Sequence, residues 1–122
     1  MKKSDKYNQE AKKLIPALSQ TFSKAPYSYV EGVYPTYLSH GKGSRVFDID
    51  NKKYIDFVLG LGPITLGHNY SAINSAIKKQ LSKCISFSIP HHIEVEASQA
   101  INSIILGVEM IRFTKTNRVV TL

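Results

Sequence analysis

Strand-forming residues on both sides of one turn constrain the fold of this 122-residue chain more than any other feature. These residues are Val46, Ile49, Tyr54, Ile55 and Phe57. Aromatic and β-branched residues favour strands, and Asn51, at the centre of Asp50-Asn51-Lys52, suits a turn because it tolerates a positive φ angle. The pattern predicts an antiparallel β-hairpin, with an earlier turn at Gly41-Lys42-Gly43.

Helical spacing of apolar residues predicts helices before and after this hairpin. The first lies within residues 5–24 and is short or kinked, because Pro16 interrupts the pattern. A second helix covers residues 73–81, where apolar residues recur at every fourth position. A third runs over residues 93–106 and ends at Gly107.

The remaining segments have less regular patterns. Residues 26–35 mix Pro, Gly and aromatic residues, which predicts an extended, ordered loop. The run GLGPITLGHN, residues 60–69, is rich in glycine, and either Asn69 or Ser71 is expected to cap the helix that follows. Residues 109–113 are expected to form a strand.

The net charge of +7 raises the question of an anionic partner. Most of the lysines cluster along the chain: Lys2, Lys3, Lys6, Lys12, Lys13, Lys52, Lys53, Lys78, Lys79 and Lys83. No interleaved aromatic residues or nucleic-acid motif accompany them, so a solvated surface is the preferred interpretation. A free-standing basic module that binds nucleic acid or an acidic protein is the alternative.

The single cysteine, Cys84, cannot form an internal disulfide, which fits a reducing compartment, and burial among apolar residues is expected for it. The lysine-rich N-terminus is not followed by an apolar run long enough for a signal peptide or a membrane span. The chain is therefore expected to be cytoplasmic.

Two groups near the hairpin suggest chemistry, but structural roles are favoured for both. Gly41-Lys42-Gly43 lacks the spacing of a phosphate-binding Walker loop, so a tight turn is preferred. Asp48, Asp50 and Asp56 lie on or beside the hairpin strands without the loop geometry of a calcium site. We expect them to be carboxylates that flank turns.

Histidines and serines later in the chain do not form a recognisable catalytic or metal-binding unit. His91 and His92 are adjacent, so their rings are expected to point apart, and neither they nor His68 have partners at a zinc-ligand spacing. Ser86 and Ser88 lack the turn that exposes a nucleophilic serine. No metal site and no catalytic residue is predicted.

The motifs become specific when they are taken in order. The run GKGSRVFDIDNKKYIDFVLGLGPITLGHN, residues 41–69, resembles the entry segment of class III aminotransferases, in which Gly-x-Gly, Asp-x-Asp-Gly, Tyr-Ile-Asp and Gly-Pro-x-x-Leu-Gly-His follow one another. The similarity continues through residues 86–101 and 108–116. Within the family the chain is most similar to the glutamate-1-semialdehyde aminomutases. Asn51 replaces the usual turn glycine, and Leu61 stands where the aminomutases tend to have Trp.

The resemblance implies an α/β fold: a small-domain β-hairpin with helices, followed by the start of the large domain of a fold-type I transferase. It implies an enzyme that transfers an amino group of a small amino compound, with pyridoxal phosphate held by a lysine and paired with an Asp. Neither of those residues is expected in this chain, so we expect it to bind no cofactor and to be inactive alone. Complete relatives are expected to be homodimers.

The resemblance also divides the chain and identifies a candidate site. It implies an N-terminal helix in residues 1–25, a small-domain loop and hairpin in 26–69, and elements leading into the cofactor-binding domain in 70–116. The candidate substrate-binding residues are Gly60, Leu61, Gly62 and Pro63. Glycine allows close approach of backbone to a ligand; a plain structural turn is the alternative reading of these residues.

Residues 117–122 depart from the family pattern, which continues with Gly-Ser/Thr-Asp/Glu-Ala. Asn-Arg-Val-Val-Thr-Leu can be encoded by AAT CGG GTA GTG ACG CTT, and another frame of these codons reads Gly-Ser-Asp-Ala. A frameshift or truncation is therefore the hypothesis for this tail, and a different set of codons in the gene would refute the frameshift. Without the rest of such an enzyme, helices 73–81 and 93–106 should expose apolar surface and limit solubility.

Overall fold

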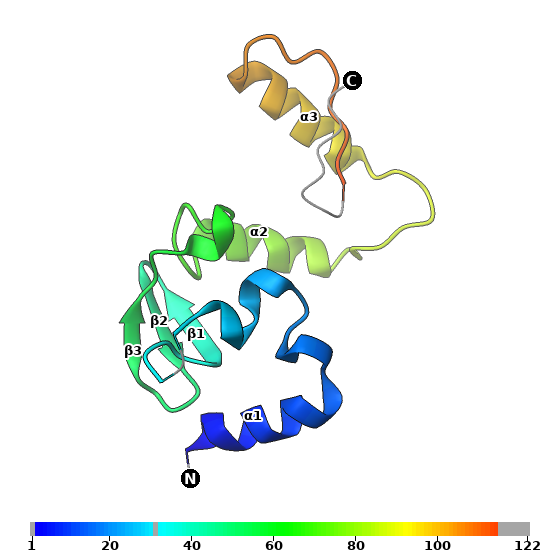
Figure 1. Cartoon of the computed structure of the whole chain (residues 1–122). Helices are drawn as coiled ribbons and strands as arrows, with labels where there is room; N and C mark the ends of the chain where they lie inside the picture. Colours follow the sequence, from blue (N-terminus) through cyan, green and yellow to red (C-terminus); the bar gives the residue numbers. More distant parts are fainter. Residues whose placement is uncertain (1, 31, 115–122) are drawn as a thin grey trace. The chain divides into compact units, whose positions relative to one another are not determined.

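The computed structural model describes residues 2–30 and 32–114 (Figure 1). The chain divides into two compact units, Met1–Lys78 and Lys79–Leu122. The tail at residues 117–122, for which a frameshift was the hypothesis, lies outside the described residues. No helix among the described residues is long and apolar enough to span a membrane.

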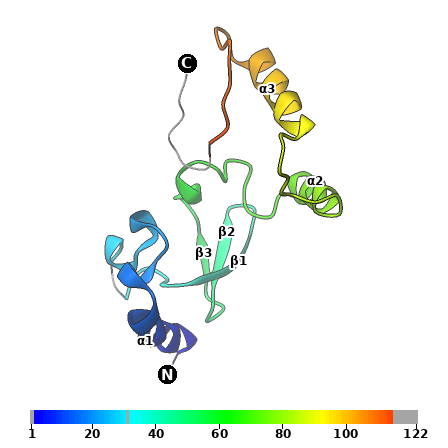
Figure 2. The ribbon, with the colours of Figure 1, turned by 90° about the vertical axis from the view of Figure 1, so that its right-hand side faces the viewer.

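A three-stranded antiparallel sheet is the centre of the first unit. Its strands are β1 (Leu38–Lys42), β2 (Arg45–Asp48) and β3 (Lys53–Ile55), and β2 lies between the other two (Figures 1 and 2). The hairpin predicted around Asp50-Asn51-Lys52 is confirmed as β2 and β3. Strand β1 was not predicted, because its sequence LSHGK contains few strand-forming residues.

Asp48 organises the hairpin turn. Its Oδ1 accepts hydrogen bonds from the backbone amides of Asp50 and Lys52, at 2.9 and 2.8 Å. Its Oδ2 accepts one from the Tyr54 hydroxyl at 3.0 Å, and the residue is only 8% exposed. Asn51 has a φ angle of 64°, as the turn pattern predicted. Asp48 is therefore the turn-flanking carboxylate that the sequence indicated.

Helix α1 (Lys3–Leu14) ends where the sequence predicted an interruption, because Ile15 is extended and Pro16 begins a separate short turn. A carboxylate from the hairpin turn caps its other end. Asp50 accepts hydrogen bonds from the Lys3 amide at 2.8 Å and from the amide and hydroxyl of Ser4. The Ser4 hydroxyl is the largest influence on the Asp50 carboxyl and lowers its pKa.

Helices α2 (Ser71–Leu81) and α3 (His92–Ile104) confirm the two predicted later helices. Gly107, expected to end the last helix, follows α3 with a φ angle of 83°. At the start of α3 the Ile93 amide donates to His91 Nδ1 at 3.1 Å. The choice between Asn69 and Ser71 as cap of α2 stays a prediction.

The prediction of a strand at residues 109–113 is wrong. Residues 108–114 have no strand assignment. A strand needs a neighbour to pair its backbone N–H and C=O groups, and no described strand pairs with this segment. The apolar pattern alone could not supply that neighbour.

Few apolar side chains are buried. Among the described residues the buried apolar residues are Ala11, Ala25 and Val46, whereas Ile73, Ile77 and Leu81 on α2 are 45%, 52% and 54% exposed. The expected apolar surface on the helices is therefore present. Cys84 is exposed, so its predicted burial is wrong. The segment that carries it is exposed throughout residues 81–90, which leaves no apolar environment to enclose the thiol.

Val46→Ala should destabilise the first unit more than Ile77→Ala. Val46 is 5% exposed, so its truncation removes buried methyl groups and should lower the free energy of unfolding by about 1–2 kcal/mol. Ile77 is 52% exposed, and its truncation should change this free energy by less than about 0.5 kcal/mol. Urea unfolding of the purified chain measures both. Equal effects would contradict the burial difference.

Candidate functional site

One side-chain pair ties together the two ends of the glycine-rich segment. Asp56 follows β3, and His68 lies twelve residues later. His68 Nε2 and Asp56 Oδ2 are 2.7 Å apart, and the side chains are 19% and 12% exposed, respectively. A pair that is mostly removed from solvent is screened less than a surface pair. Residues 57–67 therefore form a closed loop, which we call the clamped loop.

The backbone of His68 fastens the same loop to the turn between β1 and β2. The Gly43 amide donates to the His68 carbonyl at 2.9 Å, and the His68 amide donates to the Gly43 carbonyl at 2.8 Å. The Asp56 amide donates to the Ser44 carbonyl at 2.9 Å. Both ends of the clamped loop are thus bonded to adjacent residues of one turn.

Two glycines make this close contact feasible. A Cβ atom at Gly67 would lie 3.1 Å from the backbone of Gly43, and the φ angle of Gly67 is 88°. A Cβ atom at Gly41 would lie 2.7 Å from Cγ of the His68 ring. The Gly-x-Gly and Leu-Gly-His motifs are therefore two sides of a single contact.

Asp56 also holds the start of the clamped loop. Its Oδ1 accepts hydrogen bonds from the amides of Val58 and Leu59, at 2.9 and 3.1 Å. Burial is the largest single influence on the pKa of Asp56 and acts to raise it. The hydrogen bonds from His68 and the two amides, together with the charge of His68, outweigh burial and lower this pKa.

The tip of the clamped loop has an unusual backbone. In its short helical turn η4 (Leu59–Leu61) the φ angles of Leu59, Gly60 and Leu61 are 50°, 61° and 64°. A left-handed conformation costs about 1–2 kcal/mol for a residue with a side chain. Gly62 follows with φ 117°. The fixed ends of the loop maintain a conformation that the leucines alone disfavour.

The predicted site residues Gly60, Leu61, Gly62 and Pro63 lie together at this tip, and all of them are exposed. Leu61 is 68% exposed. The sequence did not identify the residues that hold the tip in place, Asp56 and His68. The spacing of His68 from Asp56 matched no known ligand or catalytic pattern. The Tyr-Ile-Asp and Leu-Gly-His motifs contain Asp56 and His68, but they did not indicate that the two side chains pair.

The other residues considered from the sequence are separated. Asp48, Asp50 and Asp56 each accept hydrogen bonds from different parts of the chain, and the described residues contain no group of acidic, His or Cys side chains that could hold a metal ion. The tight turn expected at Gly41-Lys42-Gly43 is wrong for Gly41 and Lys42, which belong to β1, because Lys42 pairs with Arg45 and the chain reverses after it.

The expectation that His91 and His92 point apart is wrong. Their ring centroids are 4.2 Å apart, and Phe87 lies 4.8 Å from the His91 ring. His91 precedes α3 in an extended conformation, so the two side chains do not follow helical spacing. His92 Nε2 lies 3.7 Å from Glu96 on the exposed side of the helix.

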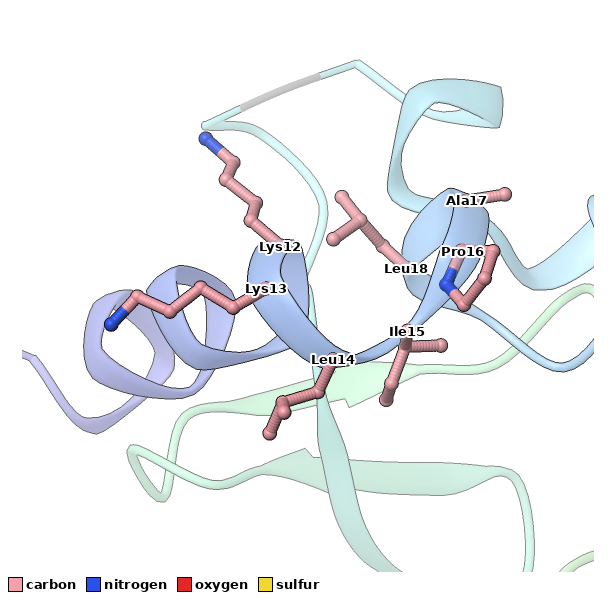
Figure 3. A pocket seen from close by; sticks show the side chains of 7 residues that line it. All are labelled: Lys12, Lys13, Leu14, Ile15, Pro16, Ala17 and Leu18. Carbon is pink, nitrogen blue, oxygen red and sulfur yellow. The ribbon is translucent and has the colours of Figure 1, made fainter.

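A surface hollow of about 460 Å³ occurs at the end of α1. Its lining is one continuous segment, residues 12–18, and Figure 3 shows that the labelled side chains fan out from it. The Lys12 and Lys13 chains extend away from Leu14 and Ile15 (Figure 3). A ligand site normally gathers polar groups from several elements, so this hollow is not the candidate site.

The described residues contain no buried lysine of the kind that a pyridoxal-phosphate site uses. Such a site requires a lysine for the Schiff base and a carboxylate for the pyridine nitrogen. Every lysine among residues 2–30 and 32–114 is exposed. The carboxylates of Asp48 and Asp56 are already used by hydrogen bonds within the chain.

Comparison with known proteins identifies the family. The family model described as Aminotransferase class-III matches residues 26–119. This chain belongs to the class III aminotransferases. The family resemblance of the sequence motifs is therefore confirmed, and complete members of the family use pyridoxal phosphate.

Relatives of this class III aminotransferase chain include several aminomutases. It is 37% identical over 91 residues to the glutamate-1-semialdehyde 2,1-aminomutase of Sulfurihydrogenibium azorense, covering 75% of this chain and 21% of that protein. It is 34% identical over 120 residues to the glutamate-1-semialdehyde 2,1-aminomutase 1 of Listeria welshimeri, covering 98% and 28%. The 3-aminobutyryl-CoA aminotransferase of Cloacimonas acidaminovorans is 35% identical, with 88% and 26% covered. The chain thus spans about a quarter of the length of these relatives.

Solved structures confirm the predicted α/β, fold-type I architecture. The ω-transaminase from Sphaerobacter thermophilus matches with a TM-score of 0.81 and 22% identity, over 93% of this chain and 25% of that one. A transaminase with pyridoxal phosphate bound matches with a TM-score of 0.80 and 28% identity, over 92% and 25%. This class III chain corresponds to the N-terminal portion of such enzymes.

The pairing of Asp56 with His68 should make the free energy of unfolding depend on pH. The Asp56 pKa is lower in the folded chain, so its stabilisation is complete above the unfolded carboxyl pKa of about 3.9 and disappears as pH falls through the folded pKa. Asp56→Asn should lower the free energy of unfolding by about 1–3 kcal/mol near pH 6, and the deficit should shrink near pH 3. Urea unfolding measures both. Glu10→Gln, at a carboxylate that is 54% exposed, is the control and should change little.

Gly67→Ala should destabilise the folded chain more than Gly32→Ala does. Both glycines have positive φ angles, 88° and 80°, so both substitutions introduce about 1–2 kcal/mol of backbone strain. Only at Gly67 does the new methyl meet backbone, 3.1 Å from Gly43. We expect this clash to weaken the two backbone hydrogen bonds between Gly43 and His68. Hydrogen exchange of the Gly43 and His68 amides should therefore be faster in Gly67→Ala than in Gly32→Ala. Equal exchange in the two variants would contradict the close contact.

Proposed function

We propose that the protein to which this chain belongs transfers an amino group of a small amino compound, as a pyridoxal-phosphate-dependent aminotransferase or aminomutase. The observation that supports this is the clamped loop, which carries the family's Gly-Pro-x-x-Leu-Gly-His motif on a fixed base. When bound, the cofactor supplies an electron sink for the amino carbon. Residues outside the described chain would bind it.

In this proposal Gly60, Leu61, Gly62 and Pro63 contact substrate. Their support is geometric: they are exposed, consecutive and held at the tip of a loop whose ends are fixed by Asp56 and His68. Glycine lets a substrate approach the backbone closely. The rigid base limits the entropy lost when substrate orders the tip. Asp56 and His68 therefore position the loop and do not take part in the chemistry.

The division of the chain follows from the same proposal. Residues 1–25 contribute an N-terminal helix, 26–69 form the small-domain part, and 70–116 lead into the cofactor-binding domain. The exposed apolar residues on α2, which are Ile73, Ile77 and Leu81, would pack against the remainder of the full-length enzyme. We further propose that the full-length enzyme is a cytoplasmic homodimer, which the lone thiol of Cys84 fits.

The chain alone should not build a cofactor site. Mixed with pyridoxal phosphate and reduced with borohydride, it should show only the absorbance of free cofactor and scattered lysine labelling. A shifted absorbance band with one stoichiometrically labelled lysine would contradict this part of the proposal. Peptide mapping after reduction identifies any labelled lysine.

A chimera tests the substrate-side role. Residues 26–114 would replace the matching segment of the Listeria welshimeri aminomutase, which is 34% identical to this chain. Leu61→Ala in the chimera should raise the KM for the amino substrate by about three-fold or more, which corresponds to a loss of about 0.7 kcal/mol. Leu66→Ala is the control, since Leu66 is on the same loop and is 60% exposed. Equal KM values for the two variants would refute the role of Leu61.

A further inference from the structure

One face of the β-sheet carries side chains that neither the clamped loop nor the proposed function uses. Successive residues of a strand point to opposite faces, and residues paired across strands share a face. The register forms the rows His40–Phe47–Lys53 and Lys42–Arg45–Ile55, and these six residues make the basic sheet face.

The opposite face is occupied by the molecule's own packing. It carries Gly41, Val46 and Tyr54, which are paired in the register, and Val46 is 5% exposed. Asp48 belongs to this face as well, because its carboxylate accepts a hydrogen bond from the Tyr54 hydroxyl. The acidic residue of β2 is therefore directed away from the basic sheet face.

The basic sheet face has charge of one sign. Lys42, Arg45 and Lys53 are basic residues, and all of them are exposed. None of the described strand positions on this face is acidic. Three cations grouped without carboxylates attract a ligand that has several negative charges.

An ordered aromatic pair lies among these cations. The rings of His40 and Phe47 are stacked, with centroids 4.4 Å apart and planes 5° from parallel. Ser39 holds the pair, since its hydroxyl lies 2.8 Å from His40 Nδ1 and 3.2 Å from the Phe47 carbonyl. Along the sequence, these two aromatic residues are not interleaved with the clustered lysines. Only the strand register brings this pair among the cations.

Any occupant of this face has to bring its own negative charges. A segment that covered Lys42, Arg45 and Lys53 without supplying carboxylates would remove three unpaired charges from water, because the face itself has no acidic residue. Burying an unpaired charge costs several kcal/mol. The charges therefore favour a ligand that brings its own anions.

We propose that the basic sheet face binds a single strand of nucleic acid. Its phosphates pair with Lys42, Arg45 and Lys53, and one base stacks on the His40–Phe47 pair. Sheets that bind single-stranded nucleic acid combine these two contacts. With strands about 4.8 Å apart, the face is about 10 Å wide and accommodates about two or three nucleotides. This activity is additional to amino-group transfer and does not depend on it.

Fluorescence anisotropy of labelled oligouridine and oligothymidine, each of about 20 nucleotides, with the purified 122-residue chain tests the proposal. Both should bind at low salt. With three phosphates neutralised, the logarithm of the binding constant should fall against the logarithm of salt concentration with a slope of about −2. A preference between the two strands identifies RNA or DNA as the ligand. No binding at about 20 mM salt refutes the proposal.

Two double variants distinguish binding at the basic sheet face from nonspecific attraction of the oligonucleotide to the positively charged chain. Lys42→Ala with Lys53→Ala should reduce the salt slope by about 1.4, whereas Lys78→Ala with Lys79→Ala, the same charge change on α2, should leave it unchanged. Equal effects of the two pairs would show nonspecific attraction to the whole chain and would overturn the proposal.

The stacking contact has its own test. Phe47→Leu should weaken binding about five-fold or more, and Phe47→Tyr should retain it. An abasic strand with the same phosphates should bind the unaltered chain about five-fold more weakly than oligothymidine. This comparison needs no variant, so it decides the matter even where Phe47→Leu unfolds the sheet. Equal binding of the abasic strand would refute base stacking.

Discussion

The contact between His68 and the turn at Gly43 is the constraint on which the rest of the first unit depends. It joins two backbone hydrogen bonds to the His68–Asp56 side-chain pair, so one residue closes a loop and attaches it to the sheet. The absence of side chains at Gly41 and Gly67 leaves the space for this contact. The loop tip can then hold positive φ angles at Leu59 and Leu61 that short-range preferences oppose.

Side-chain hydrogen bonds of the chain stabilise its turns and helix ends, whereas much of its apolar surface is exposed. Asp48, Asp50 and Asp56 each fix a turn or a helix end, which explains how short elements keep their geometry with little buried apolar area. The apolar side chains of α2, by contrast, are exposed to solvent. Under the proposed function, these apolar side chains pack against further residues of the full-length enzyme.

The two faces of the sheet differ because successive side chains of a strand point to opposite sides. Alternation along β2 sends Val46 and Asp48 to one face and Arg45 and Phe47 to the other. One face is closed by burial and hydrogen bonding, whereas the other keeps its cations in solvent. The exposed face therefore carries charge of one sign.

The sequence by itself determined the local elements and the family. The hairpin around Asn51, the break at Pro16 and the two later helices were predictable, because turn preference, ring geometry and apolar periodicity act between neighbours in the chain. The ordered motifs in residues 41–69 identified the family and the four residues at the loop tip.

Only the tertiary structure decided which distant groups meet. It joined Asp56 to His68, added β1 to the hairpin and stacked His40 on Phe47. It also left residues 109–113 without strand pairing and Cys84 exposed. Each of these outcomes depends on partners far away in sequence or on their absence, and single-sequence patterns report only on near neighbours.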